Sequence, residues 1–188
     1  TPMYITEVGK PMGLFYGFIF DGIYQTSDFR NLTEGIYVLN PGVADNGSSD
    51  VSPGVIKYKD INGDGTINDY DRVILGSPHP KHTGGFTNDF SYSTRRIGTF
   101  TLNVLLQWSY GNKVFNANRL IFEGNGTAQV GINQYKSYEE RWTPDHPSNT
   151  LFKTKGAGPQ GFISDRTLED GSYLRLKTLE LGYDLPQR

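Results

Sequence analysis

The sequence predicts a mainly β fold, made of antiparallel strands and hairpins with one or two short helices. Glycine, tyrosine and phenylalanine are abundant, at 23, 12 and 11 residues, and this composition favours strands and tight turns over a helical bundle. One segment alternates between apolar and polar side chains, and clusters of glycine, proline and small polar residues separate the candidate strands. With 188 residues, the chain has the length of one ordinary domain or of a piece of a larger one.

The alternation is clearest between residues 98 and 110. One side carries the apolar residues Phe100, Leu102, Val104, Leu106, Trp108 and Tyr110. The other side carries Thr99, Thr101, Asn103, Leu105, Gln107 and Ser109, with Leu105 as its one apolar exception. Residues 86–92 alternate in the same way and are followed by a short polar turn, so the segment 86–110 is predicted to be an antiparallel hairpin. An apolar face that ends in Trp108 and Tyr110 is typical of a lipid-facing barrel strand, but a soluble β-sandwich strand shows the same period.

The other elements follow from aromatic runs and turn residues. Residues 13–24 are aromatic on both faces and are predicted to form one buried or interfacial strand, whereas 40–54 are predicted to be an irregular connection. Ile132, Tyr135, Tyr138 and Trp142 recur three or four residues apart, which predicts a short helix ending near Thr143.

The carboxy-terminal part contains a loop and a final strand. Residues 145–165 are rich in Pro, Gly, Ser and Lys and are predicted to be a loop. Residues 171–183 read as a strand whose apolar phase slips between Leu176 and Leu179, as a β-bulge would cause.

Residues 60–71 have the spacing of a calcium-binding loop. The oxygen donors fall at loop positions 1, 3, 5, 7, 9 and 12, and they are Asp60, Asn62, Asp64, the backbone carbonyl of Thr66, Asn68 (through a water) and Asp71. Gly65 stands at position 6, where the chain turns sharply. Tight turns also use Asn, Asp and Gly, but a turn needs only one or two of them. We therefore expect a structural calcium ion. Its ligand at position 12 would be Asp71, where a longer Glu is usual.

Composition and charge exclude several classes of function. A formal net charge of −2 gives no electrostatic reason to expect nucleic acid, and the absence of cysteine excludes thiolate metal sites and a cysteine nucleophile. Adjacent acids such as Glu139 and Glu140 are only sequence neighbours and do not make a catalytic pair, so we do not expect an enzyme. No run approaches the roughly 20 apolar residues of a membrane helix, although membrane strands need only about ten alternating residues.

Six motifs in order along the chain resemble the SusC/RagA family of TonB-linked outer-membrane transporters of Bacteroidetes. They are GLFYGFIFDGIYQ at 13–25, IKYKDINGDG at 56–65, GGF at 84–86, QWSYGN at 107–112, RWTP at 141–144 and DGSYLRLK at 170–177. The resemblance covers essentially all of the sequence. It implies that residues 1–188 are a partial barrel region of a larger transporter, with a calcium-loop excursion near 55–76.

What the resemblance implies about function concerns the whole transporter. Such a protein would lie in the bacterial outer membrane, in contact with lipid and with its loops facing the cell exterior. It would import oligosaccharides or peptides together with a SusD-like surface lipoprotein. Its coupling to TonB would run through an amino-terminal region that this sequence does not include.

A calcium-dependent, dockerin-like interaction module is the alternative, because dockerins carry similar loops. A dockerin has two loops, each followed by a helix. This sequence has one loop, and the residues after it reach a proline at Pro78 within a few positions.

Overall fold

The computed structural model describes residues 3–33, 36–47, 51–123, 133–157 and 163–186, and these are mainly β. The fold class predicted from composition and alternation is therefore confirmed. The chain divides into two compact units, the first comprising Thr1–Gly76 and Phe115–Glu169 and the second Ser77–Val114 and Asp170–Arg188. Each unit is described by itself.

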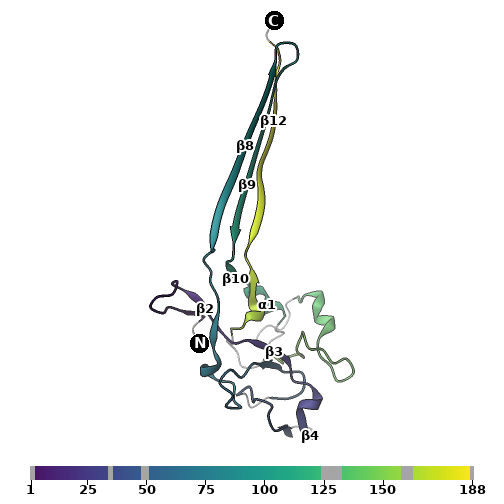
Figure 1. Cartoon of the computed structure of the whole chain (residues 1–188). Coiled ribbons are helices and arrows are strands. Elements are labelled where there is room, and N and C mark those ends of the chain that lie inside the picture. Colours follow the sequence, from purple (N-terminus) through teal and green to yellow (C-terminus); the bar gives the residue numbers. More distant parts are fainter. Residues whose placement is uncertain (1–2, 34–35, 48–50, 124–132, 158–162, 187–188) are drawn as a thin grey trace. The chain divides into compact units, whose positions relative to one another are not determined.

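The second unit is a three-stranded antiparallel sheet of long strands (Figure 1). Its strands are β8 (His82–Thr94), β9 (Gly98–Tyr110) and β12 (Tyr173–Asp184), with β9 in the centre. The predicted hairpin is confirmed, and its first strand begins four residues earlier than the alternation indicated, at His82.

The predicted bulge in the last strand is also confirmed. The pairing of β12 with β9 shifts register between Leu176 and Thr178. Leu176 lies opposite Leu106 and Leu179 lies opposite Val104, so both leucines stand on the same face despite their odd spacing.

The first unit contains short strands arranged as separate small sheets. β1 (Tyr4–Ile5), β2 (Leu14–Gly17) and β7 (Val73–Gly76) form one sheet with β2 in the centre. β3 (Phe20–Ile23) pairs with β6 (Ile56–Tyr58), and β4 (Phe29–Thr33) pairs with β5 (Ile36–Leu39). β10 (Lys113–Phe115) and β11 (Leu168–Asp170), within which the chain passes from one unit to the other, pair as a two-stranded sheet.

The single strand predicted over residues 13–24 is wrong, because the structure divides it into β2 and β3. Phe18 lies between the two strands and forms an isolated parallel bridge with Ser164. Its backbone N–H donates to the Ile163 carbonyl at 2.7 Å. A Cβ at Gly17 would lie 2.1 Å from the same carbonyl oxygen, so only glycine permits this approach. The break is therefore imposed by a distant segment of the chain.

The core of the first unit gathers residues from several of these short elements. It consists of Phe18, Ile23, Tyr24, Phe29, Val55, Ile56, Tyr58, Ile67, Trp142 and Phe152. The described part of 40–54 contains no helix or strand, as predicted, yet it is tied to this core. The Tyr24 hydroxyl donates to the Ala44 carbonyl at 2.6 Å, and Tyr24 itself is fully buried.

The helical segments among the described residues are short. They are η1 (Thr26–Asp28), η2 (Asp69–Asp71), α1 (Ala117–Phe122), η3 (Lys136–Glu140) and η4 (Asp165–Thr167). The helix expected near Thr143 is shorter than predicted: η3 ends before Trp142, and Ile132 lies outside the described residues. Trp142 is buried in the core, so its spacing from Tyr138 does not reflect one helical face. Within the described ranges, no helix has the length and apolar character needed to cross a membrane.

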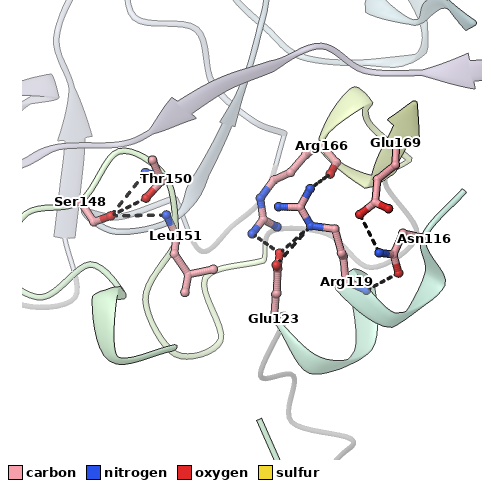
Figure 2. A network of polar contacts seen from close by, with 8 residues as sticks. All are labelled: Asn116, Arg119, Glu123, Ser148, Thr150, Leu151, Arg166 and Glu169. Atoms are coloured by element: carbon pink, nitrogen blue, oxygen red, sulfur yellow. Dashed lines mark hydrogen bonds and ion pairs between the residues drawn. The ribbon is translucent and has the colours of Figure 1, made fainter. Parts of the chain in front are cut away.

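An ion-pair network docks α1 against η4 (Figure 2). Glu123 follows α1 and lies between two guanidinium groups, 2.7 Å from that of Arg166 and 3.1 Å from that of Arg119. Arg119 also donates to the Arg166 carbonyl at 2.7 Å. Arg166 stacks over the Phe152 ring at 4.9 Å, and burial lowers the pKa of its guanidinium while Glu123 opposes that shift. The network thus joins segments 43 residues apart.

Candidate functional site

The predicted calcium loop connects β6 to β7 and is closed by its own polar side chains. Asp60 accepts backbone N–H groups from Gly63 and Gly65, at 2.6 and 2.8 Å. Asn62 accepts from the Asp64 N–H and Asp64 accepts from the Thr66 N–H, both at 2.8 Å. The loop is therefore folded around these oxygens.

Four of the six predicted donors meet around Asp64. The amides of Asn62 and Asn68 donate to its Oδ2 atom at 3.0 and 3.4 Å, and the Asn68 amide also donates to the Thr66 carbonyl at 3.1 Å. The Thr66 N–H and the Asn62 amide hold the pKa of the Asp64 carboxyl below its usual value. The exposed Asp64 carboxylate therefore stays ionised to a lower pH than an ordinary aspartate does.

Asp71 differs from the other donors because it is fully buried. Its Oδ1 atom accepts the N–H groups of Ile61 and Asn62, at 2.9 and 3.3 Å, and its Oδ2 atom accepts that of Asn68 at 2.8 Å. Three backbone N–H groups therefore depend on one carboxylate. This role follows from the fold and is not visible in the donor spacing.

The loop is anchored on both sides. Ile67, at position 8 of the loop, is buried in the core. Asp45 forms a parallel bridge with Thr66, and backbone bonds run from the Asp45 N–H to the Gly65 carbonyl at 2.9 Å and from the Ile67 N–H to the Asp45 carbonyl at 2.7 Å. The sequence did not identify Asp45 as a partner of the loop, because an isolated bridge leaves no periodic pattern in the sequence.

Arg72 provides a further anchor directly after the loop. Its guanidinium donates to the Tyr16 carbonyl at 3.1 Å and lies 4.4 Å from the centre of the Tyr16 ring. The loop is thereby joined to β2.

The donor set of this loop could hold a cation. Its donors are carboxylate, amide and carbonyl oxygens, which suit a hard cation such as calcium. Across the described residues, no group of three or more His, Asp or Glu side chains is arranged to hold a metal ion. A calcium ion would accordingly need the Asn62 and Asn68 amide groups to turn their oxygens toward Asp64 in place of their NH₂ groups.

A second feature is the apolar face of the second unit. Residues that pair directly across an antiparallel sheet stand on the same face. The apolar face follows the even-numbered residues of β9 from Phe100 to Tyr110. Those from Phe100 to Trp108 are paired on β12 with Tyr183, Leu181, Leu179, Leu176 and Leu174. On β8 the residues from Phe100 to Tyr110 are paired with Tyr92, Phe90, Asn88, Phe86, Gly84 and His82. We call this set of paired residues the apolar face.

The apolar face is exposed and has aromatic residues at both ends. Leu179 and Leu181 are 65% and 77% exposed. At one end Phe100 stacks on Tyr183 with ring centroids 4.7 Å apart, and at the other His82 stacks on Tyr110 at 5.1 Å. An exposed apolar surface of this extent marks an interaction with a partner or a membrane.

The opposite face of the sheet is polar. Ser91, Asp89 and Thr87 of β8 lie opposite Thr101, Asn103 and Leu105 of β9. Asp89 accepts a hydrogen bond from the Asn103 amide. One face of the sheet therefore suits an apolar medium and the other suits water.

Comparison with known proteins agrees with these observations. The chain is 33% identical over 183 residues to the TonB-dependent receptor P3 of Formosa agariphila, which covers 97% of this chain. It is 34% identical over 137 residues, or 71% of this chain, to the TonB-dependent receptor P26 of the same organism. The chain spans only 16% and 13% of the length of these two relatives.

A solved structure resembles the chain as well. A chain in the structure of the RagAB peptide transporter superposes with a TM-score of 0.57 and 25% identity, covering 96% of this chain and 17% of that one. No family model matches the sequence. The relatives are receptors and transporters and not enzymes. The loop ends in η2 and is followed in this chain by β7, where a dockerin would have a helix.

Proposed function

Because this chain belongs to the TonB-dependent receptors of the SusC/RagA kind, we propose that it forms barrel strands and loops of an outer-membrane transporter. The transporter imports oligosaccharides or peptides with a SusD-like surface lipoprotein, and TonB supplies the energy. The RagAB peptide transporter supports a peptide as one class of substrate. The observation that carries the proposal is the apolar face of β8, β9 and β12.

The length of the apolar face fits a membrane. Phe100 and Tyr110 mark its aromatic ends on β9, and the ten residue steps between them correspond to about 33 Å of strand. Strands of membrane barrels are tilted by roughly 40°, so this length rises through about 25 Å, the height of the apolar band of such barrels.

The connections suggest an orientation. β8 and β9 are joined by residues 95–97 alone, whereas β9 and β12 are separated by residues 111–172. Membrane barrels place short turns in the periplasm and long loops outside the cell. The Trp108 end of the apolar face would then lie in the outer leaflet.

An arginine on the apolar face tests membrane insertion. Leu179→Arg places a charge near the middle of the band, where it is expected to destabilise the barrel by about 2–4 kcal/mol. Thr178→Arg is the matched control, because Thr178 pairs with Leu105 on the polar face. We expect Leu179→Arg to lower the amount of receptor in the outer membrane, and Thr178→Arg to preserve both that amount and protonophore-sensitive uptake of labelled peptide or oligosaccharide. Equal tolerance of the two variants would contradict a lipid-facing role.

We further propose that the loop 60–71 binds one structural calcium ion through Asp60, Asn62, Asp64, Thr66, Asn68 and Asp71. The support is the donor spacing together with the gathering of Asn62, Asn68 and the Thr66 carbonyl around Asp64. An ion that binds only the ordered loop stabilises it by mass action, by about 2.7 kcal/mol at a concentration 100 times its Kd.

Calcium dependence is tested with Asp64→Ala. We expect millimolar calcium to raise the unfolding midpoint relative to a chelator, and this rise to disappear in Asp64→Ala. Asp69→Ala is the control, because the Asp69 side chain is 85% exposed and outside the donor set. A calcium response that persists in Asp64→Ala would show that the ion does not bind through Asp64. No response in the unaltered protein would mean that the loop is held by turn chemistry alone.

A further inference from the structure

The second unit has a notch at the Tyr110 end of its apolar face. The pairing of β9 with β12 ends at Ser109. Tyr110, one position further on, is paired with His82 of β8 and, among the described residues, with none of β12. A cavity of about 480 Å³ opens at this place, and Trp108 and Leu174 line it together with Tyr110 and His82. We call this cavity the notch, and its size is typical of sites for small ligands.

A glycine on β8 keeps the notch open. The Trp108 indole lies across Gly84, where a Cβ would be 2.3 Å from the ring. The indole N–H donates to Nδ1 of His82 at 3.1 Å, and the His82 ring stacks on that of Tyr110. These contacts hold the indole over β8, whereas Leu174 stands on β12 and is 71% exposed. The notch is therefore a preformed cleft between an aromatic and an aliphatic side chain.

The mouth of the notch carries a hydrogen-bond donor and a cation. An indole can only donate, so the neutral His82 ring, which accepts its bond at Nδ1, has its own proton on Nε2. Lys81 precedes His82, and its aliphatic stem packs against Gly111, where a Cβ would lie 2.8 Å from Cγ of Lys81. Among the described residues Lys81 takes part in no ion pair. Its stem is thus held beside Tyr110, while its charged end is exposed.

Ser172 also lines the notch and ties its wall together. The Ser172 hydroxyl accepts the Gly111 N–H at 2.9 Å and donates to the Asp170 carboxylate at 2.6 Å. The hydrogen bonds from Ser172 and the charge of Lys113 lower the pKa of the Asp170 carboxyl. Because Lys113 compensates Asp170, the charge of Lys81 makes this group of three side chains positive.

We propose that the notch binds one anionic membrane lipid, with an acyl chain in the cleft and the headgroup phosphate against Lys81 and His82. The inference rests on the proposed function, under which the apolar face meets lipid and the Trp108 end lies in the outer leaflet. The cleft continues that face, and its positive mouth complements an anionic headgroup. A zwitterionic lipid offers the same phosphate together with a cation of its own, so the anionic lipid is preferred.

The test measures lipid affinity by native mass spectrometry of the full-length receptor, purified in a neutral detergent. The probes are phosphatidylglycerol and phosphatidylcholine with identical acyl chains, so that they differ only in the headgroup. We expect phosphatidylglycerol to bind about tenfold more tightly, the effect of one hydrogen bond to a charged group. An excess of inorganic phosphate is expected to leave it bound, because phosphate has no acyl chain.

One set of variants connects the preference to the mouth of the notch. Lys81→Gln is expected to remove most of the preference for phosphatidylglycerol. Adding His82→Phe, which keeps an aromatic ring beside Tyr110, is expected to remove the rest. Lys177→Gln is the matched control, because Lys177 is an exposed cation at the bulge of β12 and does not line the notch.

A second pair of variants tests the cleft. Gly84→Ala forces the Trp108 indole off β8 toward Leu174, so it is expected to weaken binding of both lipids about tenfold, as the loss of two buried methylene groups would. Gly85→Ala is the matched control, because a Cβ there would meet only the Leu106 carbonyl oxygen, at an ordinary 3.5 Å. If Gly84→Ala prevents folding, the variants at the mouth still decide the question.

Four results would overturn the inference: equal binding of the two lipids, a preference that survives in Lys81→Gln with His82→Phe, displacement by inorganic phosphate, or no lipid binding because another segment of the receptor fills the notch. The proposed function is tested separately by protonophore-sensitive uptake. Uptake without lipid preference would refute the lipid site alone. Lipid preference without uptake would refute the transport function and leave the lipid site standing.

Discussion

Replacing Glu123 with glutamine is expected to destabilise the docking of α1 against η4 by about 3 kcal/mol, the lower end of the range for breaking a buried ion pair. The side chains of Glu123 and Arg166 are only 12% and 10% exposed, and Glu123 is the shared partner of two guanidinium groups. Without its charge, Arg119 and Arg166 would face each other with no compensating anion. Arg119 is one-third exposed, which is why we place the effect at the lower end.

The effect should be local, so we would measure it by amide hydrogen exchange. The Asn116 N–H donates to the Thr167 carbonyl across this junction. Its protection is expected to fall about a hundredfold in Glu123→Gln, as 3 kcal/mol implies. Glu169→Gln is the matched control in the same network. Exposed Glu169 accepts from the neutral Asn116 amide at 2.7 Å and, among the described residues, takes part in no ion pair. Unchanged protection in Glu123→Gln would show that the ion pair adds nothing to docking.

The second large effect is expected at Asp71, and it does not depend on calcium. In Asp71→Ala the N–H groups of Ile61, Asn62 and Asn68 lose their acceptor in a buried position. Each unsatisfied buried donor costs about 1–3 kcal/mol, and water entering the altered loop would relieve part of that cost, so we expect a loss of about 3 kcal/mol.

The measurement is the exchange rate of the Ile61 and Asn68 amides, made with a chelator present throughout. Asp71→Asn keeps one acceptor oxygen and is expected to show an intermediate loss of protection. Asp69→Ala removes an exposed neighbouring carboxylate and is expected to change stability by less than about 0.5 kcal/mol. If Asp71→Ala protected these amides as well as the unaltered protein does, the backbone role of Asp71 would be refuted.

The sequence allowed the second unit to be predicted because its pattern is local. Alternation along β9 identified the apolar face. Side chains alternate with a period of two, so the odd spacing between Leu176 and Leu179 was enough to identify the bulge. The donor spacing of residues 60–71 was equally local. The bonds from Asp71 to Ile61 and Asn68 were not predicted, because they depend on how the loop folds.

The first unit was harder to predict because long-range contacts determine it. The bridge from Phe18 to Ser164 divides an otherwise continuous aromatic run, and the ion pair from Glu123 to Arg166 joins segments with no common pattern. The meeting of these segments is a property of the packed core and not of sequence spacing.

The bulge in β12 has a consequence for the evolution of this strand. Because side chains alternate, inserting or deleting one residue in a paired strand turns every residue on one side of the change to the other face. Because of the extra residue near Lys177, the residues of the apolar face have even numbers from Leu174 to Leu176 and odd numbers from Leu179 to Tyr183. Losing that residue would make the alternation regular and would keep the leucines of both halves on the apolar face. Related β12 strands should therefore tolerate a deletion at the bulge, whereas a single-residue deletion elsewhere in the strand would turn one part of it to the polar face.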